Sequence, residues 1–166
     1  MATPEFIVSL RQKIGHDMLW LPGVSIVVVD EAGRILLGRR ADNGRWAVVS
    51  GIPEPGEQPA VAIRRECLEE TGVDVEVLAL TDVTAGEPFA FPNGDNCVFM
   101  DINFVGRARP GTAARAHVAD DESTHVDWFE PDALPEPLLS STPGRIEAAL
   151  AWLADPCAGA RFHPAP

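Results

Sequence analysis

The segment over residues 51–73 constrains the fold of this 166-residue chain more than any other. It begins with Gly51-Ile52-Pro53-Glu54-Pro55-Gly56-Glu57, which holds too much glycine and proline for a regular helix or strand. Pro59 then suits the first position of a helix, where its missing amide hydrogen costs nothing, and Gly72 suits the end. The segment therefore predicts a tight loop that leads directly into a helix over about residues 59–71.

This predicted helix carries three carboxylates, Glu66, Glu69 and Glu70, at positions i, i+3 and i+4. That spacing places them on one face, where like charges destabilise a helix by roughly 0.2–0.5 kcal/mol per pair. Such clusters are what Mg²⁺ or Mn²⁺ binds when substrate phosphates supply further ligands. The alternative is a solvated acidic face, partly neutralised by Arg65. The adjoining loop favours the metal site, because it can hold backbone carbonyls beside the carboxylates.

Strand-like runs flank the segment on both sides. β-Branched residues bounded by Gly, Asn and Asp predict strands over residues 23–30, 34–40, 46–50, 73–80, 96–105 and 123–129. Apolar residues at helical spacing predict further helices over residues 5–15 and 144–154, and the polar residues 106–122 are expected to form a long loop. Strands and helices in this order favour an α/β fold.

The charge balance excludes one class of partner. Thirteen basic residues face 25 acidic ones, which gives a formal net charge of −12, and Lys13 is the only lysine. Proteins bind nucleic-acid polymers mainly through Lys and Arg that neutralise phosphates, so a polymer is not the expected partner.

Other global features favour the cytoplasm. Residues 24–29 form the longest apolar run, far short of the roughly 18 residues that a membrane span needs, so no membrane association is expected. The amino terminus shows no secretory signal pattern. The cysteines, an odd number in no CxxC pair, suit reduced thiols; they are Cys67, Cys97 and Cys157.

The segment over residues 51–73 also matches a known motif. The Nudix box is written G-x5-E-x7-R-E-U-x-E-E-x-G-U, with U a bulky aliphatic residue. Its fixed positions and spacings are all met by Gly51, Glu57, Arg65-Glu66-Cys67, Glu69-Glu70 and Gly72-Val73. The chain therefore resembles the Nudix hydrolase family. Trp46 ahead of the box and Val126-Asp127-Trp128-Phe129 near the end extend the resemblance to about residues 22–135.

Two departures from the family pattern stand in this chain. Cys67 occupies an aliphatic position, which is a conservative change in packing. Ser50 precedes the box glycine where many relatives have another glycine, and its conformational range is narrower.

The resemblance implies a Nudix-type α/β/α sandwich with a mixed β-sheet. We expect a single domain over residues 1–166, with a helical N-terminal extension over 1–20, a core over 22–135 and a C-terminal helix over 143–154. It further implies an enzyme that uses Mg²⁺ or Mn²⁺ to cleave a phosphoric anhydride bond in a small nucleoside diphosphate derivative.

The resemblance also assigns roles within the box. Glu66, Glu69 and Glu70 are the implied metal ligands and catalytic residues, with the backbone carbonyl of Ser50 as a further metal ligand. Glu57 and Arg65 are implied to form a salt bridge that fixes the loop to the helix. Two glycines complete the structural set: Gly51 and Gly72.

Three residues outside the box keep two interpretations each. Glu122 is either an additional metal-binding or basic glutamate, as in some relatives, or part of a solvated acidic loop. Phe89 and Phe91 either shape the substrate site or simply pack, with packing favoured.

Several functions remain open at this point. The leading hypothesis is cleavage of a nucleoside diphosphate linked to another moiety X, such as ADP-ribose or a nucleotide sugar. One alternative is a (d)NTP pyrophosphohydrolase that clears unwanted nucleotides. Another is a non-catalytic module that senses nucleotide sugars, which the intact set of box glutamates disfavours. The sequence leaves the oligomeric state open, a homodimer included.

Overall fold

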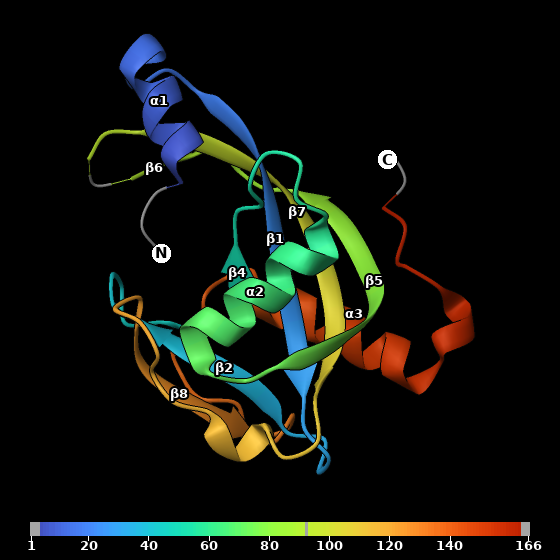
Figure 1. The fold of residues 1–166 in the computed structure, drawn as a ribbon. Helices are drawn as coiled ribbons and strands as arrows, with labels where there is room; N and C mark the ends of the chain where they lie inside the picture. The colour runs from blue at the N-terminus through green and yellow to red at the C-terminus, as the bar shows by residue number, and fades with distance from the viewer. Residues whose placement is uncertain (1–3, 92, 164–166) are drawn as a thin grey trace.

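A computed structural model describes residues 4–91 and 93–163 (Figure 1). Residues 1–3 of the expected N-terminal extension, Pro92 and residues 164–166 lie outside the described part. The helices are α1 (Glu5–Ile14), α2 (Pro59–Thr71) and α3 (Thr142–Ala154), with short 3₁₀ turns η1 (Ala113–Arg115) and η2 (Pro156–Ala158). The strands are β1 (Leu19–Val29), β2 (Ile35–Arg40), β3 (Trp46–Ala47), β4 (Val49–Gly51), β5 (Val75–Ala85), β6 (Phe89–Ala90), β7 (Asn96–Ala108) and β8 (Ser123–Phe129).

The strands form one mixed sheet with the central order β3-β2-β1-β7-β5. β1 and β7 run parallel, whereas the other pairs are antiparallel, including β4 with β1, β6 with β7 and β8 with β2. α2 covers one face of the sheet and α3 the other (Figure 1). The predicted α/β/α sandwich with a mixed sheet is confirmed.

β1 occupies the centre of the sheet and is buried on both faces. Its alternating side chains divide between two cores, which explains its unbroken β-branched run. The core under α2 contains Val24, Ile26, Val28, Leu36, Val49, Ala62, Ile63, Cys67, Val73, Val75, Phe104 and Ala108. The core under α3 contains Val27, Val29, Ile35, Leu37, Val48, Val105, Ile146 and Ala149.

In the described part of the chain, the helices are too short or too polar to cross a bilayer.

Several strand boundaries differ from the sequence predictions. β1 begins at Leu19, because its ladder with β7 runs from the pair Leu19 and Cys97 to the pair Val29 and Arg107. Part of the predicted 106–122 loop belongs to β7, which continues to Ala108, and another part forms η1. The single strand predicted over residues 46–50 is two strands, because β3 pairs with β2 while β4 pairs with β1. These differences follow from long-range pairing.

Ile63 tests the attachment of α2 to the sheet. Its side chain is fully buried in the core under α2, whereas Val61 on the same helix is 59% exposed. We expect Ile63→Ala to lower the free energy of unfolding by about 2–5 kcal/mol, because it leaves a cavity. Val61→Ala is the control and should change it by less than about 0.5 kcal/mol. Denaturant unfolding measures both, and equal effects would contradict this packing.

Candidate active site

The loop over residues 51–58 lies against α2 through a close backbone approach. A Cβ atom at Gly51, the last residue of β4, would lie 2.5 Å from the carboxyl carbon of Glu66. Glycine is required here because any side chain would displace that carboxylate. At the other end of α2, Gly72 adopts a left-handed conformation (φ 70°), and its amide donates to the carbonyl of Leu68. The two glycines therefore fix where the helix meets the sheet and where it ends.

An ion pair between Arg65 and Glu57 fixes the same loop to the helix. Arg65 donates from Nε to Glu57 Oε1 at 3.0 Å and from Nη2 to Oε2 at 2.9 Å. This two-pronged geometry is the strong form of an arginine–carboxylate contact, and it holds the pKa of Glu57 below its usual value. Glu57 Oε2 also accepts from the amide of Glu54 at 3.0 Å. The loop is thus closed on itself and fastened beside Glu66.

The three glutamates of α2 occupy two environments rather than the one expected. Glu66 and Glu70 are 2% and 9% exposed. The side chain of Glu69 is 56% exposed and accepts a hydrogen bond from Arg65 Nη1 at 3.1 Å. Neighbouring helical residues are turned by about 100°, which separates Glu69 from Glu70 although each is close in angle to Glu66. The structure therefore buries Glu66 and Glu70 and leaves Glu69 at the surface.

Burial raises the pKa of both inner carboxylates. The pKa is about 7 for Glu66, where nearby Arg65 opposes the rise, with its Nη1 3.0 Å from Oε1. The pKa is about 8 for Glu70, because Glu66 and Asp120 add to the effect of burial. Neither Glu66 Oε1 nor Glu70 Oε1 accepts a hydrogen bond from the described residues. The positive charges of Arg65 and Arg40 therefore offset only part of the cost of burying these two carboxylates.

A divalent cation needs several oxygen ligands, and the side chains of this site supply only some of them. Buried carboxylate oxygens without donors are suitable ligands for a hard cation. Within the described residues, no three acidic, histidine or cysteine side chains converge as a metal-binding group. Glu66 and Glu70 fit a cation only if other oxygens, from the backbone or from a substrate, complete its coordination.

The loop between β7 and β8 brings further acids to this site. The amides of His117 and Ala119 donate to the carbonyls of Thr71 and Glu70, both at 3.1 Å, and so satisfy the end of α2. The amide of Glu122 donates to Asp120 Oδ1 at 3.0 Å. These bonds place Asp120 and Glu122 next to the last turn of α2.

A small pocket opens beside Glu70, where β2, β4, α2 and β8 meet. Its lining residues are Gly38, Arg40, Ala47, Val48, Val49, Ser50, Glu70, Thr71, Glu122 and Ser123. Glu122 is half-buried and lines the same pocket as Glu70.

Sequence reasoning missed two charged neighbours of Glu70, namely Arg40 and Asp120. Arg40 ends β2, lines the pocket and donates to Asp42 through Nε at 2.9 Å and Nη2 at 2.7 Å. Its positive charge acts to lower the pKa of Glu70. The available signal was an arginine at the end of a hairpin strand, but only the sheet topology shows that this strand end reaches α2.

The aromatic side chains on either side of the motif lie in two environments. Trp46 lies in a core, whereas Phe89 and Phe91 lie at the surface. Trp46 is half-buried and packs edge-on against Phe129, with ring centroids 4.9 Å apart, in the core under α3. Phe89 and Phe91 are 43% and 38% exposed and pack against each other, with centroids 4.7 Å apart. These two rings are therefore available to a ligand.

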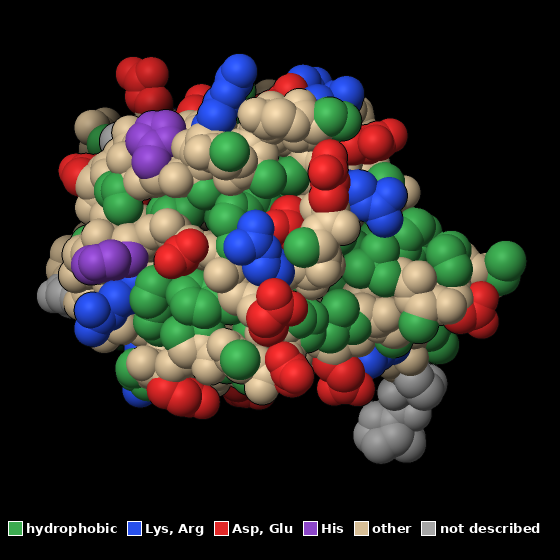
Figure 2. All heavy atoms as spheres, turned by 90° about the horizontal axis from the view of Figure 1, so that it is seen from below, with side chains coloured by type: hydrophobic (Ala, Val, Ile, Leu, Met, Phe, Trp, Pro, Cys, Tyr) green, Lys and Arg blue, Asp and Glu red, His purple; other side chains and the backbone are tan. Residues whose placement is uncertain are grey.

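The opposite end of the sheet holds a larger hollow without comparable chemistry. Figure 2 shows this end, where acidic side chains are spread among hydrophobic ones. The hollow measures about 550 Å³ and is lined in part by Asp30, Arg34, Arg109 and Trp128. Asp30 accepts from the amides of Ala32 and Arg34 and from Arg34 Nε, at 2.8–2.9 Å. Its carboxylate is satisfied within its own turn, unlike those of Glu66 and Glu70.

Known proteins share both the sequence pattern and the fold. The NUDIX domain profile matches residues 19–152. A MutT-like protein of Streptomyces ambofaciens is 38% identical over 128 residues, which cover 77% of this chain and 75% of that protein. The 8-oxo-dGDP phosphatase NUDT18 of Mus musculus is 32% identical over 137 residues, or 81% of this chain and 38% of NUDT18. The crystal structure of a MutT NUDIX hydrolase from Burkholderia pseudomallei aligns with a TM-score of 0.63 at 28% identity, covering 78% of this chain and 98% of the other.

The chain therefore belongs to the Nudix hydrolase family and is an enzyme that acts on pyrophosphate bonds. Nudix hydrolases generally use a divalent metal, which agrees with the buried carboxylate pair. The chain spans less than half the length of NUDT18. α1 lies outside the residues that the family profile matches.

The raised pKa values predict how stability depends on pH. Between pH 4.5, the ordinary pKa, and pH 8, folded Glu66 and Glu70 bind more protons than the unfolded chain does. The free energy of unfolding of cation-free protein should therefore fall as the pH rises through this window. Denaturant unfolding with a chelator present measures it. Glu70→Gln should flatten the slope, whereas Glu76→Gln, at an exposed position of β5, should not. A wild-type stability that rises over this window would contradict the prediction.

Proposed function

We propose that this protein is a divalent-cation-dependent pyrophosphohydrolase that cleaves a nucleoside diphosphate linked to another moiety X. The products are a nucleoside monophosphate and phosphoryl-X. The observation that carries the proposal is the buried pair Glu66 and Glu70, whose Oε1 atoms accept no hydrogen bond from the described residues, beside a pocket that also contains Arg40.

Glu66 and Glu70 would hold this cation, Mg²⁺ or Mn²⁺, with the backbone carbonyl of Ser50 as a further ligand. Glu69 is a secondary candidate, because it is exposed and engaged with Arg65. A bound cation would neutralise the diphosphate, lower the pKa of the attacking water and offset the repulsion between the two buried carboxylates.

The remaining residues of the site divide into two groups. Glu122 lines the same pocket as Glu70 and is our candidate to accept the proton of the attacking water. Arg40 brings a positive charge to an otherwise acidic protein, where it faces the anionic substrate. Glu57 and Arg65 are positioning residues, because their contacts fix the loop rather than reach the reacting atoms.

The substrate is a small molecule, with ADP-ribose or a nucleotide sugar as the first choice. The net charge of −12 and the single lysine disfavour a polymer, which needs many basic contacts along its backbone. A diphosphate needs few such contacts once a cation carries most of the charge.

The free thiols of Cys67, Cys97 and Cys157 agree with a cytoplasmic location.

Hydrolysis of damaged or surplus nucleotides is the second candidate. The 32% identity to NUDT18, an 8-oxo-dGDP phosphatase, favours it. Both candidates use the same two glutamates, so they differ only in the groups attached to the phosphates.

Removal of one inner carboxylate tests the site directly. Glu66→Gln and Glu70→Gln keep the side-chain shape and delete a charge. Each should lower kcat by about a hundredfold or more, as the loss of one electrostatic contact to a transition state does. Glu76→Gln is the control and should retain full activity, and circular dichroism shows whether each variant is folded. Near wild-type rates in both test variants would place the chemistry elsewhere.

A substrate panel separates the two candidate functions. Purified protein with Mg²⁺ is offered ADP-ribose, nucleotide sugars, CDP-alcohols, dinucleoside polyphosphates and (d)NTPs, and the products are identified by chromatography. We expect ADP-ribose to give AMP and ribose 5-phosphate. Release of pyrophosphate from triphosphates, with negligible cleavage of any diphosphate-X, would reverse the ranking.

A further inference from the structure

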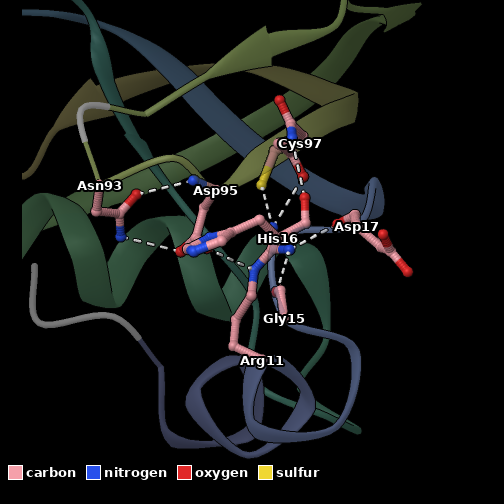
Figure 3. Close-up of polar contacts among 8 residues, drawn as sticks. Arg11, Gly15, His16, Asp17, Asn93, Asp95 and Cys97 are labelled. Atoms are coloured by element: carbon pink, nitrogen blue, oxygen red, sulfur yellow. Dashed lines mark hydrogen bonds and ion pairs between the residues drawn. The ribbon is translucent and has the colours of Figure 1, made fainter.

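Arg11 joins α1 to the sheet through an unusually dense set of contacts (Figure 3). Its Nη2 donates to the carbonyl of Asn96 at 2.8 Å and to Cys97 Sγ at 3.2 Å. Its Nη1 donates to the carbonyls of Gly15 and Asp17 at 3.1 and 2.6 Å. The side chain is only 11% exposed. One guanidinium therefore holds the end of α1 and the start of β7 together.

The same cluster fixes residues 93–95, which belong to the described part of the turn between β6 and β7. Asp95 Oδ1 lies 3.4 Å from Arg11 Nε and 2.9 Å from His16 Nδ1. Asn93 Nδ2 donates to the other carboxylate oxygen of Asp95 at 3.0 Å, and the amide of Asp95 donates back to Asn93 Oδ1. The amide of Phe91 donates to the carbonyl of Asp95 at 2.9 Å. The position of this turn therefore depends on α1.

This turn belongs to a hairpin that presents aromatic rings. Phe89 lies on β6 opposite Cys97 and stacks on Phe99, with centroids 6.0 Å apart, while Phe91 packs against Phe89. Exposed aromatic rings of this kind suit a planar base, because stacking needs only a free ring face. The rings are thus placed by contacts that begin at Arg11.

The aromatic hairpin and the catalytic loop are both anchored on one small core. Ile52, the residue after Gly51, packs with Phe99 against a small core of Ile7, Leu21 and Cys97. Gly51 in turn lies against the carboxylate of Glu66. The loop beside Glu66 and the strand that carries Phe99, on which Phe89 stacks, are therefore held by the same core.

We infer that Arg11 is a positioning residue of the substrate site. Through it α1 holds the β6–β7 hairpin so that Phe89 and Phe91 contact the base of the substrate, while α2 acts on the diphosphate. This inference rests on the proposed function. It assigns a role in substrate recognition to a helix that precedes the family-matched residues 19–152.

The test separates substrate binding from chemistry. Arg11→Gln in the full chain should raise KM about tenfold for the best diphosphate-X substrate and leave kcat within about twofold, the pattern of a lost binding contact. Arg11→Lys should restore only part of the affinity, because an ammonium lacks the planar five-donor fork. Arg34→Gln is the matched control, since Arg34 forms a similar ion pair with Asp30 in the β1–β2 turn. It should leave KM unchanged.

A double-mutant cycle and hydrogen exchange identify the route of the effect. Phe91→Ala should also raise KM, and adding Arg11→Gln to it should give less than the product of the two changes. The amides of Phe91 and Gly94 should exchange faster in Arg11→Gln. An unchanged KM in folded Arg11→Gln overturns the inference, even if exchange is faster, and so does a fully multiplicative cycle.

Failure of the proposed function is recognised separately. If wild-type protein hydrolyses no member of the panel, the proposed function has failed, and binding of ADP-ribose by calorimetry replaces KM as the readout. Weaker binding to Arg11→Gln than to Arg34→Gln then supports the positioning role. Equal binding to both variants overturns it.

Discussion

The burial of two carboxylates one helical turn apart is the constraint on which the rest of the site depends. An unpaired charge in a protein interior is strongly unfavourable unless it takes up a proton or gains a positive partner. Glu66 and Glu70 take this position although α2 has a solvent-facing side that accepts Glu69 readily. Ile63 and Cys67, on the same buried side, supply the apolar contact that holds the helix in place. The surrounding core therefore sustains a locally unfavourable arrangement, which binding of the proposed cation would relieve.

Two different parts of the fold serve this pair. The box loop and α2 are fixed by local contacts, above all the ion pair of Arg65 with Glu57 and the approach of Gly51 to Glu66. The walls of the pocket come from distant segments: the end of β2, the start of β8 and the loop before it. In the proposed function, the short segment acts on the diphosphate, and the distant segments recognise the rest of the substrate.

The same division explains what the sequence could predict. The helix was expected over about residues 59–71 and runs from Pro59 to Thr71, because proline, glycine and the loop residues act locally. The different burial of Glu69 and Glu70 was not predictable, since it depends on which side of the helix meets β4. Arg40 and Asp120 were missed because strand pairing and loop hydrogen bonds bring them to Glu70 from elsewhere in the chain. Arg11 gave no local signal for the same reason.

The parallel ladder between β1 and β7 has a consequence for how the enzyme acquires activity during folding. It joins the beginning of the matched domain to a strand from its second half, and the whole catalytic segment lies between the two. Pairings between such distant segments form slowly, because a long loop must close before any of its contacts stabilise it. α2 can form early, but the pocket beside Glu70 also needs Glu122 and Ser123, which follow β7 in the chain. A chain still emerging from the ribosome thus carries the complete motif well before it carries a working site.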